Sequence, residues 1–408
     1  MSEWKKVKLG DIASAIQTGP FGSQLHQSDY SDVGTPVVMP KDIVCGKIDV
    51  SAIARVESHH VERLSRHKIN EGDILYARRG DVGKCAYTDK SQTGWLCGTG
   101  CLRVTVDKAK AMPEFVFFQL QKKDTVGWVE KHAIGATMLN LNTSILSNVP
   151  IELPSLSTQH RIASILSRYD SLIENYQKQI KLLEEAAQRL YKEWFVDLHF
   201  PGYENTKIVD GVPEGWEKKP ALDFFEMSIG KTPPRAQKQW FTKVSNGIPW
   251  VSISDMKDTM FVQKTAEELT QDACENYNIK VVPKGTILLS FKLTVGRVAF
   301  AGADVCTNEA IVHFQKEGDE WKAYTLMYLR NYNYDSLGNT SGISKAVNST
   351  IIKNMPFVMP CTAILQEFSQ RVLPFIKQTE NLQSQIRLLT EARDRLLPKL
   401  MSGEIKVS

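Results

Sequence analysis

Hydrophobic residues recur at alternating steps of three and four through two long stretches of the chain. The first stretch contains Leu166, Tyr169, Ile173, Tyr176, Ile180, Leu183, Ala187, Leu190 and Trp194. The second, shifted by 206 residues, contains Val372, Phe375, Thr379, Leu382, Ile386, Leu389, Arg393, Leu396 and Leu400. This 3.5-residue repeat is typical of a coiled coil, and no glycine interrupts either stretch. We therefore expect two helices of about 35–40 residues that pair antiparallel, rather than two separate core helices.

Shorter patterns before each long helix predict a mixed α/β domain. The β-branched runs at 101–106 and 310–314 indicate strands, and 112–123 and 321–331 are typical of short amphipathic helices. Prolines at 154 and 360 end each globular part. The predicted order is a first domain at 1–154, a spacer helix at 155–198, a linker and second domain at 199–360, and a second spacer helix with a tail at 361–408.

The two halves carry the same short segments in the same order. "ILYARRGDVGKCAY" (74–87) matches "ILLSFKLTVGRVAF" (287–300), and "LNTSILSNVPIELP" (141–154) matches "VNSTIIKNMPFVMP" (347–360). Each match is weak alone, but their shared order at a nearly constant offset indicates a duplicated domain. The predicted fold is therefore α+β, with two tandem domains, an antiparallel coiled coil and a pseudo-two-fold axis.

Composition narrows the class of protein. The 408 residues are 42% hydrophobic and 24% charged, which is typical of a globular protein of two domains. No apolar run reaches the roughly 18 residues of a membrane span, and the N-terminal residues do not resemble a signal peptide, so we expect a cytoplasmic protein. The net charge is only +4, so a polyanion partner must be recognised by local clusters.

Known catalytic and metal-binding motifs are absent from the sequence. The Gly83-Lys84 pair lacks the first glycine and the final Ser or Thr of a phosphate-binding loop. H-E-x-x-H, G-x-S-x-G and the Asn-Pro-Pro-aromatic motif of amino-methyltransferases do not occur. The seven cysteines lack zinc-site spacing. We therefore expect no catalytic residue and no metal site in this chain.

The matched segments 74–87 and 287–300 each predict a β-hairpin with a basic tip. The tips carry Arg78, Arg79 and Lys84 in the first copy and Lys292 and Arg297 in the second. Arginine and lysine at such tips suit guanine edges and phosphates, although a solvated tip is the plainer alternative. Thr18 and the pair Lys231-Thr232, in the aligned turns "QTGP" and "GKTP", are weaker candidates for DNA contacts.

The chain resembles the specificity subunits of type I restriction–modification systems over essentially its whole length. The most specific parts of this resemblance are the segments 149–195, 190–217 and 355–397. The second copy departs from the pattern at Cys361-Thr362, where a proline and small apolar residues are usual. The resemblance implies a non-catalytic subunit in which each domain reads one half of a split site in double-stranded DNA. It also implies helices that set the spacing and dock two methyltransferase subunits, with motor-nuclease subunits joining. S-adenosylmethionine, ATP and Mg²⁺ would belong to those partners.

Two other classes of function are open to the sequence. One is an enzyme, a methyltransferase or nuclease with its own active site, against which the missing motifs argue. The other is a stand-alone DNA-binding regulator or a structural coiled-coil protein. The copies also diverge where readout would occur: 59–68 is basic, whereas the equivalent 272–281 is mildly acidic. This divergence predicts an asymmetric DNA site with unrelated halves.

Overall fold

The structure is a computed structural model that describes residues 4–135, 139–242, 247–337 and 347–407. It divides into two compact units. Unit 1 contains the residues up to Ser171 together with those from Leu389 onward, and unit 2 contains Leu172–Leu388. Each unit therefore combines one α/β domain with part of both long helices.

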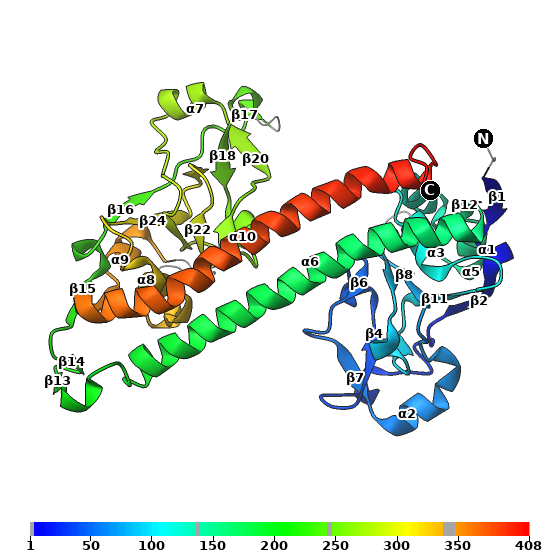
Figure 1. Ribbon diagram of the computed structural model, residues 1–408, viewed down its shortest axis with the longest axis horizontal. Helices are drawn as coiled ribbons and strands as arrows, with labels where there is room; N and C mark the ends of the chain where they lie inside the picture. Colours follow the sequence, from blue (N-terminus) through cyan, green and yellow to red (C-terminus); the bar gives the residue numbers. More distant parts are fainter. Residues whose placement is uncertain (1–3, 136–138, 243–246, 338–346, 408) are drawn as a thin grey trace. The chain divides into compact units, whose positions relative to one another are not determined.

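Unit 1 is built on two four-stranded sheets (Figure 1). The first has the antiparallel order β2 (Ala13–Thr18), β11 (Cys101–Val106), β8 (Ile74–Ala77) and β9 (Cys85–Tyr87). The second has the order β10 (Leu96–Cys97), β4 (Thr35–Val38), β7 (Ala54–Val56) and β3 (Tyr30–Ser31), with β10 parallel to β4. Two short pairs complete the unit: β1 (Lys5–Lys8) with β12 (Pro150–Leu153), and β5 (Ile43–Val44) with β6 (Lys47–Ile48).

Unit 2 repeats this topology. Its first sheet has the order β16 (Glu226–Ile229), β24 (Ile311–Gln315), β21 (Ile287–Ser290) and β22 (Val298–Ala301), and adds β19 (Phe261–Val262). Its second sheet has the order β17 (Phe241–Thr242), β20 (Glu267–Leu269), β18 (Ile248–Val251) and β23 (Cys306–Thr307). The pair β15 (Glu217–Pro220) with β25 (Pro356–Met359) matches β1 with β12, and β13 (Ile208–Val209) pairs with β14 (Val212–Pro213). The predicted duplication and the predicted mixed α/β class are confirmed.

The predicted short helices exist, but their predicted amphipathic character is wrong. They are α3 (Pro113–Leu120) and α8 (Lys322–Asn331), and side chains on nearly every side of each are buried. The reason is that α3 contacts β9, β11, β12 and α4 (Lys123–His132), while α8 packs between β21, β22 and the aromatic residues of a long helix. A helix that is covered on all sides has no polar face to show in the sequence.

Two of the remaining short helices of unit 1, α2 (Ser58–Arg63) and α5 (Thr143–Ser147), have counterparts in unit 2, α7 (Gln271–Asn276) and α9 (Ser349–Lys353). A further short helix of unit 1 is α1 (Leu9–Ile12). In α5 the Asn142 side chain accepts a hydrogen bond from the Ile145 amide at 2.8 Å, and in α9 Asn348 accepts one from Ile351 at 2.8 Å. The matched asparagines of the sequence are therefore matched N-caps.

The two predicted long helices are α6 (Leu156–Tyr191) and α10 (Thr362–Met401) (Figure 1). In unit 1 the start of α6 packs against the end of α10, and Asp170 Oδ1 lies 2.6 Å from Arg393 Nη1. In unit 2 the end of the first long helical segment packs against the start of α10, and the Trp194 and Phe368 ring centroids are 5.8 Å apart. The helices therefore run antiparallel within each unit.

The hydrophobic repeat falls on the covered sides of these helices. All of the predicted seam residues, Leu166, Tyr169, Ile173, Tyr176, Ile180, Leu183, Leu190, Trp194, Val372, Phe375, Leu382, Ile386, Leu389, Leu396 and Leu400, are buried or half-buried. By contrast, Leu172, Leu182 and Leu388, which fall outside the repeat, are exposed. One detail differs: α6 ends at Tyr191, and Trp194 lies in a following π-helical turn, Lys192–Val196. None of the helices in the described residues combines the length and hydrophobicity of a membrane span.

Candidate nucleic-acid interface

The predicted hairpins are present in both units. In unit 1, β8 and β9 pair Leu75 with Ala86, and the tip spans 78–84. In unit 2, β21 and β22 pair Leu288 with Ala299, and the tip spans 291–297. In both units nearly all of the strand residues are buried, whereas residues 79–81 and 84 of the first tip and residues 293 and 294 of the second are exposed. Each buried hairpin therefore presents its tip at the surface of the domain.

In unit 1, two other loops meet the hairpin tip. The Gly19 amide donates to the Cys101 carbonyl at 2.9 Å, and the Thr99 hydroxyl donates to the Pro20 carbonyl at 3.0 Å. The Arg78 amide donates to the Gly100 carbonyl at 2.8 Å. The turn after β2, the hairpin tip and the loop between β10 and β11 thus form one surface, which we call the loop face.

Unit 2 builds an equivalent loop face from equivalent segments. The Gly230 amide donates to the Ile311 carbonyl at 3.2 Å, and the Phe291 amide donates to the Ala310 carbonyl at 2.9 Å. The Thr232 hydroxyl donates to the Glu309 carboxylate. The weaker sequence candidates, Thr232 and its neighbour Lys231, therefore lie beside the hairpin tip that carries the stronger ones.

Close backbone packing holds each turn in place. A Cβ added to Gly19 would lie 2.0 Å from the Gly98 carbonyl oxygen, and one added to Gly230 would lie 2.2 Å from the Thr307 carbonyl oxygen. No side chain fits at these distances. Since the two glycines occupy the same place in the two copies, the framework of the loop face is shared while its side chains differ.

In unit 1 the candidate residues differ in how freely they can bind. Arg79 is exposed, and no hydrogen bond or ion pair engages its guanidinium within the described part of the chain. Arg78 is half-buried, with its Cζ 5.8 Å from the centroid of the Phe21 ring. Lys84 Nζ lies 3.0 Å from Asp81 Oδ2. Thr18 is half-buried at the end of β2, opposite Leu102. Arg79 is therefore the most available cation of this tip.

In unit 2 the candidates differ in the same way. Lys231 is exposed, and its carbonyl accepts a hydrogen bond from Trp250 Nε1 at 3.3 Å. Lys292 Nζ lies 5.6 Å from the centroid of the Phe291 ring. Arg297 donates from Nη1 to the Ile253 carbonyl at 2.7 Å. Part of the Arg297 guanidinium is thus used to hold its own domain, and Lys292 is half-buried, so Lys231 is the most available of the three cations.

Sequence analysis missed two charged residues of this loop face. Arg235 lies 4.4 Å from the Trp250 ring centroid, and its Nη1 is 2.6 Å from Glu267 Oε2. The position of Arg235 just after the "GKTP" turn could have identified it from the sequence.

The second missed residue is Glu309. Partial burial raises the pKa of Glu309, but the hydrogen bond from Thr232 and the nearby cations outweigh this effect, so the net pKa is lowered. The carboxylate therefore stays ionised and can accept a hydrogen bond.

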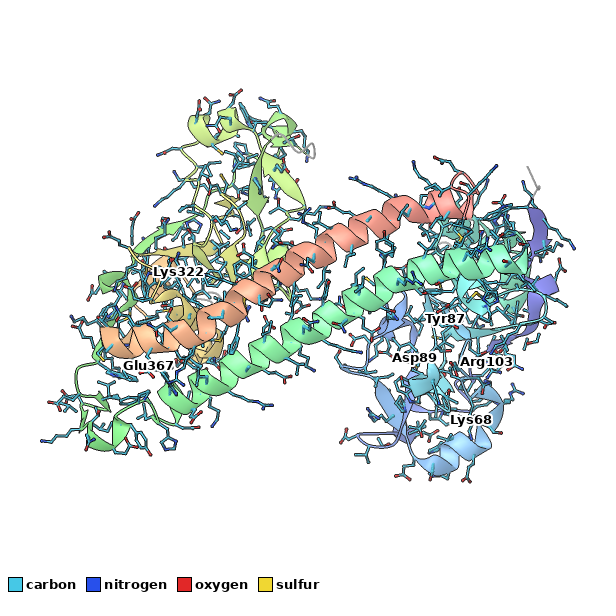
Figure 2. All side chains as sticks on the ribbon, viewed as in Figure 1. Lys68, Tyr87, Asp89, Arg103, Lys322 and Glu367 are labelled. Carbon is cyan, nitrogen blue, oxygen red and sulfur yellow. The ribbon has the colours of Figure 1, made fainter. Side chains whose placement is uncertain are left out.

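Beneath each loop face one buried polar residue occupies the same strand position. In unit 1 it is Arg103, which is labelled together with Lys68 in Figure 2. Arg103 donates to Gln17 Oε1 at 2.7 Å and to the Lys68 carbonyl. In unit 2 it is His313, whose Nδ1 lies 2.9 Å from Ser228 Oγ and whose Nε2 lies 2.7 Å from Thr307 Oγ1. Different chemistry therefore supports the same backbone in the two copies.

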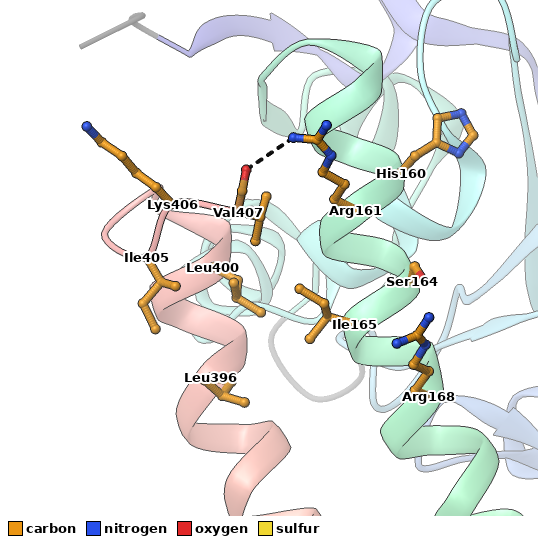
Figure 3. A pocket seen from close by; sticks show the side chains of 10 residues that line it. All are labelled: His160, Arg161, Ser164, Ile165, Arg168, Leu396, Leu400, Ile405, Lys406 and Val407. Carbon is orange, nitrogen blue, oxygen red and sulfur yellow. Dashed lines mark hydrogen bonds between the residues drawn. The ribbon is translucent and has the colours of Figure 1, made fainter.

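A cavity of about 610 Å³ lies between α6 and α10 in unit 1 (Figure 3). Arg161, Arg168 and Lys406 contribute cations, and Ile165, Leu396 and Leu400 contribute apolar groups. Arg161 Nη1 donates to the Val407 carbonyl at 3.5 Å. Figure 3 shows the His160 ring directed away from α10.

The described residues contain no cluster of three or more His, Cys, Asp or Glu side chains arranged for a metal.

Two copies of one α/β domain, each with a basic loop face and a long helix, define a duplicated recognition protein. A family model described as the type I restriction modification DNA specificity domain matches residues 1–185 and 213–390. The chain belongs to this family: it is a specificity subunit of a type I restriction–modification system, with two tandem target recognition domains that recognise DNA sequence.

Known relatives cover almost the whole chain. The type I restriction enzyme HindI specificity subunit of Haemophilus influenzae is 23% identical over 474 aligned residues, which cover 99% of this chain and 100% of that one. The MjaIX specificity subunit of Methanocaldococcus jannaschii is 26% identical over 423 residues, covering 99% and 94%. The crystal structure of a type I S subunit from M. genitalium shares the fold, with a TM-score of 0.63, 15% identity and coverage of 97% and 96%.

Proposed function

We propose that each target recognition domain reads one half of an asymmetric, bipartite DNA site through its loop face. The observation that carries this proposal is that three equivalent segments meet in both domains while the side chains they present differ. Arg78 and Arg79 of the first tip correspond to Phe291 and Lys292 of the second. A shared framework with different donors, acceptors and apolar groups is what two different base sequences require.

The cations of the two loop faces have distinct roles in this proposal. Arg79 presents an exposed planar guanidinium, which can donate two hydrogen bonds to a guanine edge or to a phosphate. Lys231 and Lys292 present point charges suited to phosphates. Arg297 and Lys84 contribute less, because each already bonds within the protein. Thr18 and Thr232, in the turns beside these groups, are weaker candidates for DNA contacts, and the Thr232 hydroxyl already donates to Glu309.

The chemistry of the complete enzyme lies on other subunits in this proposal. The chain itself is non-catalytic, and α6 and α10 set the separation of the half-sites and dock two methyltransferase subunits. Motor-nuclease subunits join this core, and S-adenosylmethionine, ATP and Mg²⁺ bind to the partners. Exposed Leu172, Leu182 and Leu388 support docking on the helices, since they offer apolar contacts outside the seam. The complex acts in the cytoplasm, where it meets the chromosome.

Alanine substitution of the loop-face cations tests the proposal. The variants are Arg79→Ala and Lys84→Ala in the first domain and Lys231→Ala, Lys292→Ala and Arg297→Ala in the second. Binding to the mapped DNA site is measured at several salt concentrations. A base-reading arginine should cost about 1–3 kcal/mol and relax one position, whereas a phosphate-binding lysine should weaken all sequences and reduce the salt slope by about one.

Two matched lysines provide the control. Lys6 and Lys218 are exposed at equivalent places in β1 and β15, outside both loop faces. Lys6→Ala and Lys218→Ala should leave affinity and specificity unchanged. Unchanged binding with all five of these cations substituted would contradict their assignment as DNA contacts.

A further inference from the structure

The tip of the second hairpin carries an exposed leucine where the first has a glycine. Leu293 is 83% exposed, the largest value among the exposed large hydrophobic residues of the described chain. The corresponding residue of the first tip is Gly80, which has a φ of +74°. Leu293 keeps the same backbone region, with a φ of +61°. A leucine thus occupies a position where glycine is the natural choice.

Local hydrogen bonds hold the leucine in this conformation. The Thr294 amide donates to the Lys292 carbonyl at 2.7 Å, which closes a three-residue turn centred on Leu293. The Ser290 hydroxyl donates to the Thr294 carbonyl at 2.6 Å and accepts from the Arg297 amide at 3.0 Å. A turn of this kind is strained for a residue with a side chain. Strain that is kept at a rigid, exposed tip indicates a functional constraint.

The surroundings of Leu293 indicate the kind of partner it meets. Phe291 is buried and anchors the tip, Lys292 stands beside the leucine, and the turn that bears Lys231 belongs to the same loop face. An apolar group beside cations suits a surface that is polyanionic but has an apolar group within reach. The major groove of DNA is such a surface, because it admits a two-stranded ribbon and displays the 5-methyl group of thymine.

We propose that Leu293 contacts the 5-methyl group of one thymine in the half-site read by the second domain. This inference rests on the proposed function, because it requires the second loop face to enter the major groove. Leucine has no hydrogen-bonding group in its side chain, so it leaves the donors and acceptors of other base edges unsatisfied and favours the methyl group. The second domain would thereby specify an A·T pair that the glycine in the first domain cannot specify.

The test removes the methyl group alone. Duplexes carry the site mapped by methylation sequencing, and each thymine in turn is replaced by uracil. Binding is measured with the full-length chain in the complex with which it purifies, as wild type and as Leu293→Gly. One uracil should weaken the wild type by about fourfold, the value of one buried methyl group, and should leave Leu293→Gly unaffected. The control variant Leu222→Ala, at another exposed leucine of unit 2, should respond to uracil as the wild type does.

Both substitutions at position 293 are chosen so that the tip keeps its fold. Glycine already occupies the equivalent position in the first domain, and Leu293→Asn provides a second variant that tolerates a positive φ. Both should bind the thymine and uracil duplexes equally well. If they still distinguish thymine from uracil as the wild type does, the methyl contact is made elsewhere and the proposal is wrong.

Other outcomes separate this inference from the proposed function. Equal binding of the wild type to every uracil duplex, or a site with no A·T pair in either half, would overturn the methyl contact while specific binding persisted. Tighter binding of the wild type to a duplex with an abasic position would assign Leu293 as a wedge between bases and would also overturn it. A wild type that bound the mapped site no better than a scrambled duplex would contradict the proposed function itself.

Discussion

The burial of single polar residues could not be predicted from the sequence of this protein. The strands at 101–106 and 310–314 follow from their β-branched composition, but nothing in those runs shows that Arg103 and His313 point into the interior. Their partners, such as Gln17 and Ser228, come from strands more than 80 residues away. Exposed tip residues such as Arg79 were predictable, because a charged turn between apolar strands is a local pattern. Buried polar partners were not, because they depend on which strands pair.

Burial of His313 makes the stability of the second domain depend on pH. Burial, and to a smaller extent the nearby Lys280 charge, lower the pKa of His313 to about 4. Below pH 6.5 the His313 imidazole is protonated in the unfolded chain, whereas in the folded chain it stays neutral until about pH 4. The stabilisation is therefore complete above pH 6.5 and is lost as the pH falls toward 4, by about 2 kcal/mol at pH 5.

Chemical unfolding at pH 7.5 and pH 5 measures this dependence. His313→Gln keeps a donor and an acceptor but cannot titrate, so it should lose much less stability than the wild type between the two pH values. The control His26→Gln, at an exposed histidine, should behave as the wild type does. An unchanged loss in His313→Gln would assign the pH dependence to another group.

Elements with strong local patterns were predicted well from the sequence. Both long helices and both hairpins follow from periodicity or from matched segments. The amphipathic character of α3 and α8 was wrong, because tertiary packing covers both sides of each. The loop face could not be assembled beforehand either. Gly19 meets Gly98, and Gly230 meets Thr307, only after the sheet has formed.

The hydrophobic repeat of α10 includes Arg393, which pairs with Asp170, and Thr379, which should lower the stability of the protein. Thr379 is fully buried, and its hydroxyl has no hydrogen-bond partner in the described part of the chain. Thr379→Val keeps the shape and removes the unsatisfied group, so the free energy of unfolding should rise by about 1 kcal/mol. Thermal or urea unfolding measures the change. The reverse substitution at the equivalent position of α6, Ile173→Thr, should lower stability, and a Thr379→Val protein less stable than wild type would show that the hydroxyl is satisfied.

The architecture of the whole molecule results from a duplication, and this architecture was the feature best predicted from the sequence. Two segments at nearly constant offset were enough to predict two domains of one topology, and the two four-stranded orders of unit 1 recur in unit 2, where β19 is added. What the sequence could not supply is the base sequence that each domain reads. Readout depends on single side chains at loop tips, where the copies differ and no periodic pattern constrains the residue.

Lengthening both helices tests whether they set the gap between the half-sites. Ile180 and Glu184 of α6 line the same cleft as Gln383 of α10, so one heptad is inserted after Leu183 and one after Leu382. Seven residues add about 10.5 Å, or roughly three base pairs at about 3.4 Å each. The variant should methylate the same half-sequences with a gap about three base pairs longer, at reduced activity because the added DNA turns one half-site by about 100°.

A four-residue insertion in α6 alone serves as the contrast. It breaks the alternation of three and four in the seam, so it should abolish methylation or unfold the helices. If a folded protein with both heptads inserted still methylated sites with the original gap, the helices would not set the gap between the half-sites.

Genome-wide mapping of methylated adenines, in cells carrying either the wild-type complex or a Lys231→Ala, Lys292→Ala double variant, tests the central claim most directly. The account predicts that the wild-type complex methylates an asymmetric site made of two unrelated short sequences with a fixed gap. The variant, altered only in the second loop face, should relax or lose one of these halves and keep the other. A palindromic site, or equal relaxation of both halves, would contradict the assignment of one half-site to each domain.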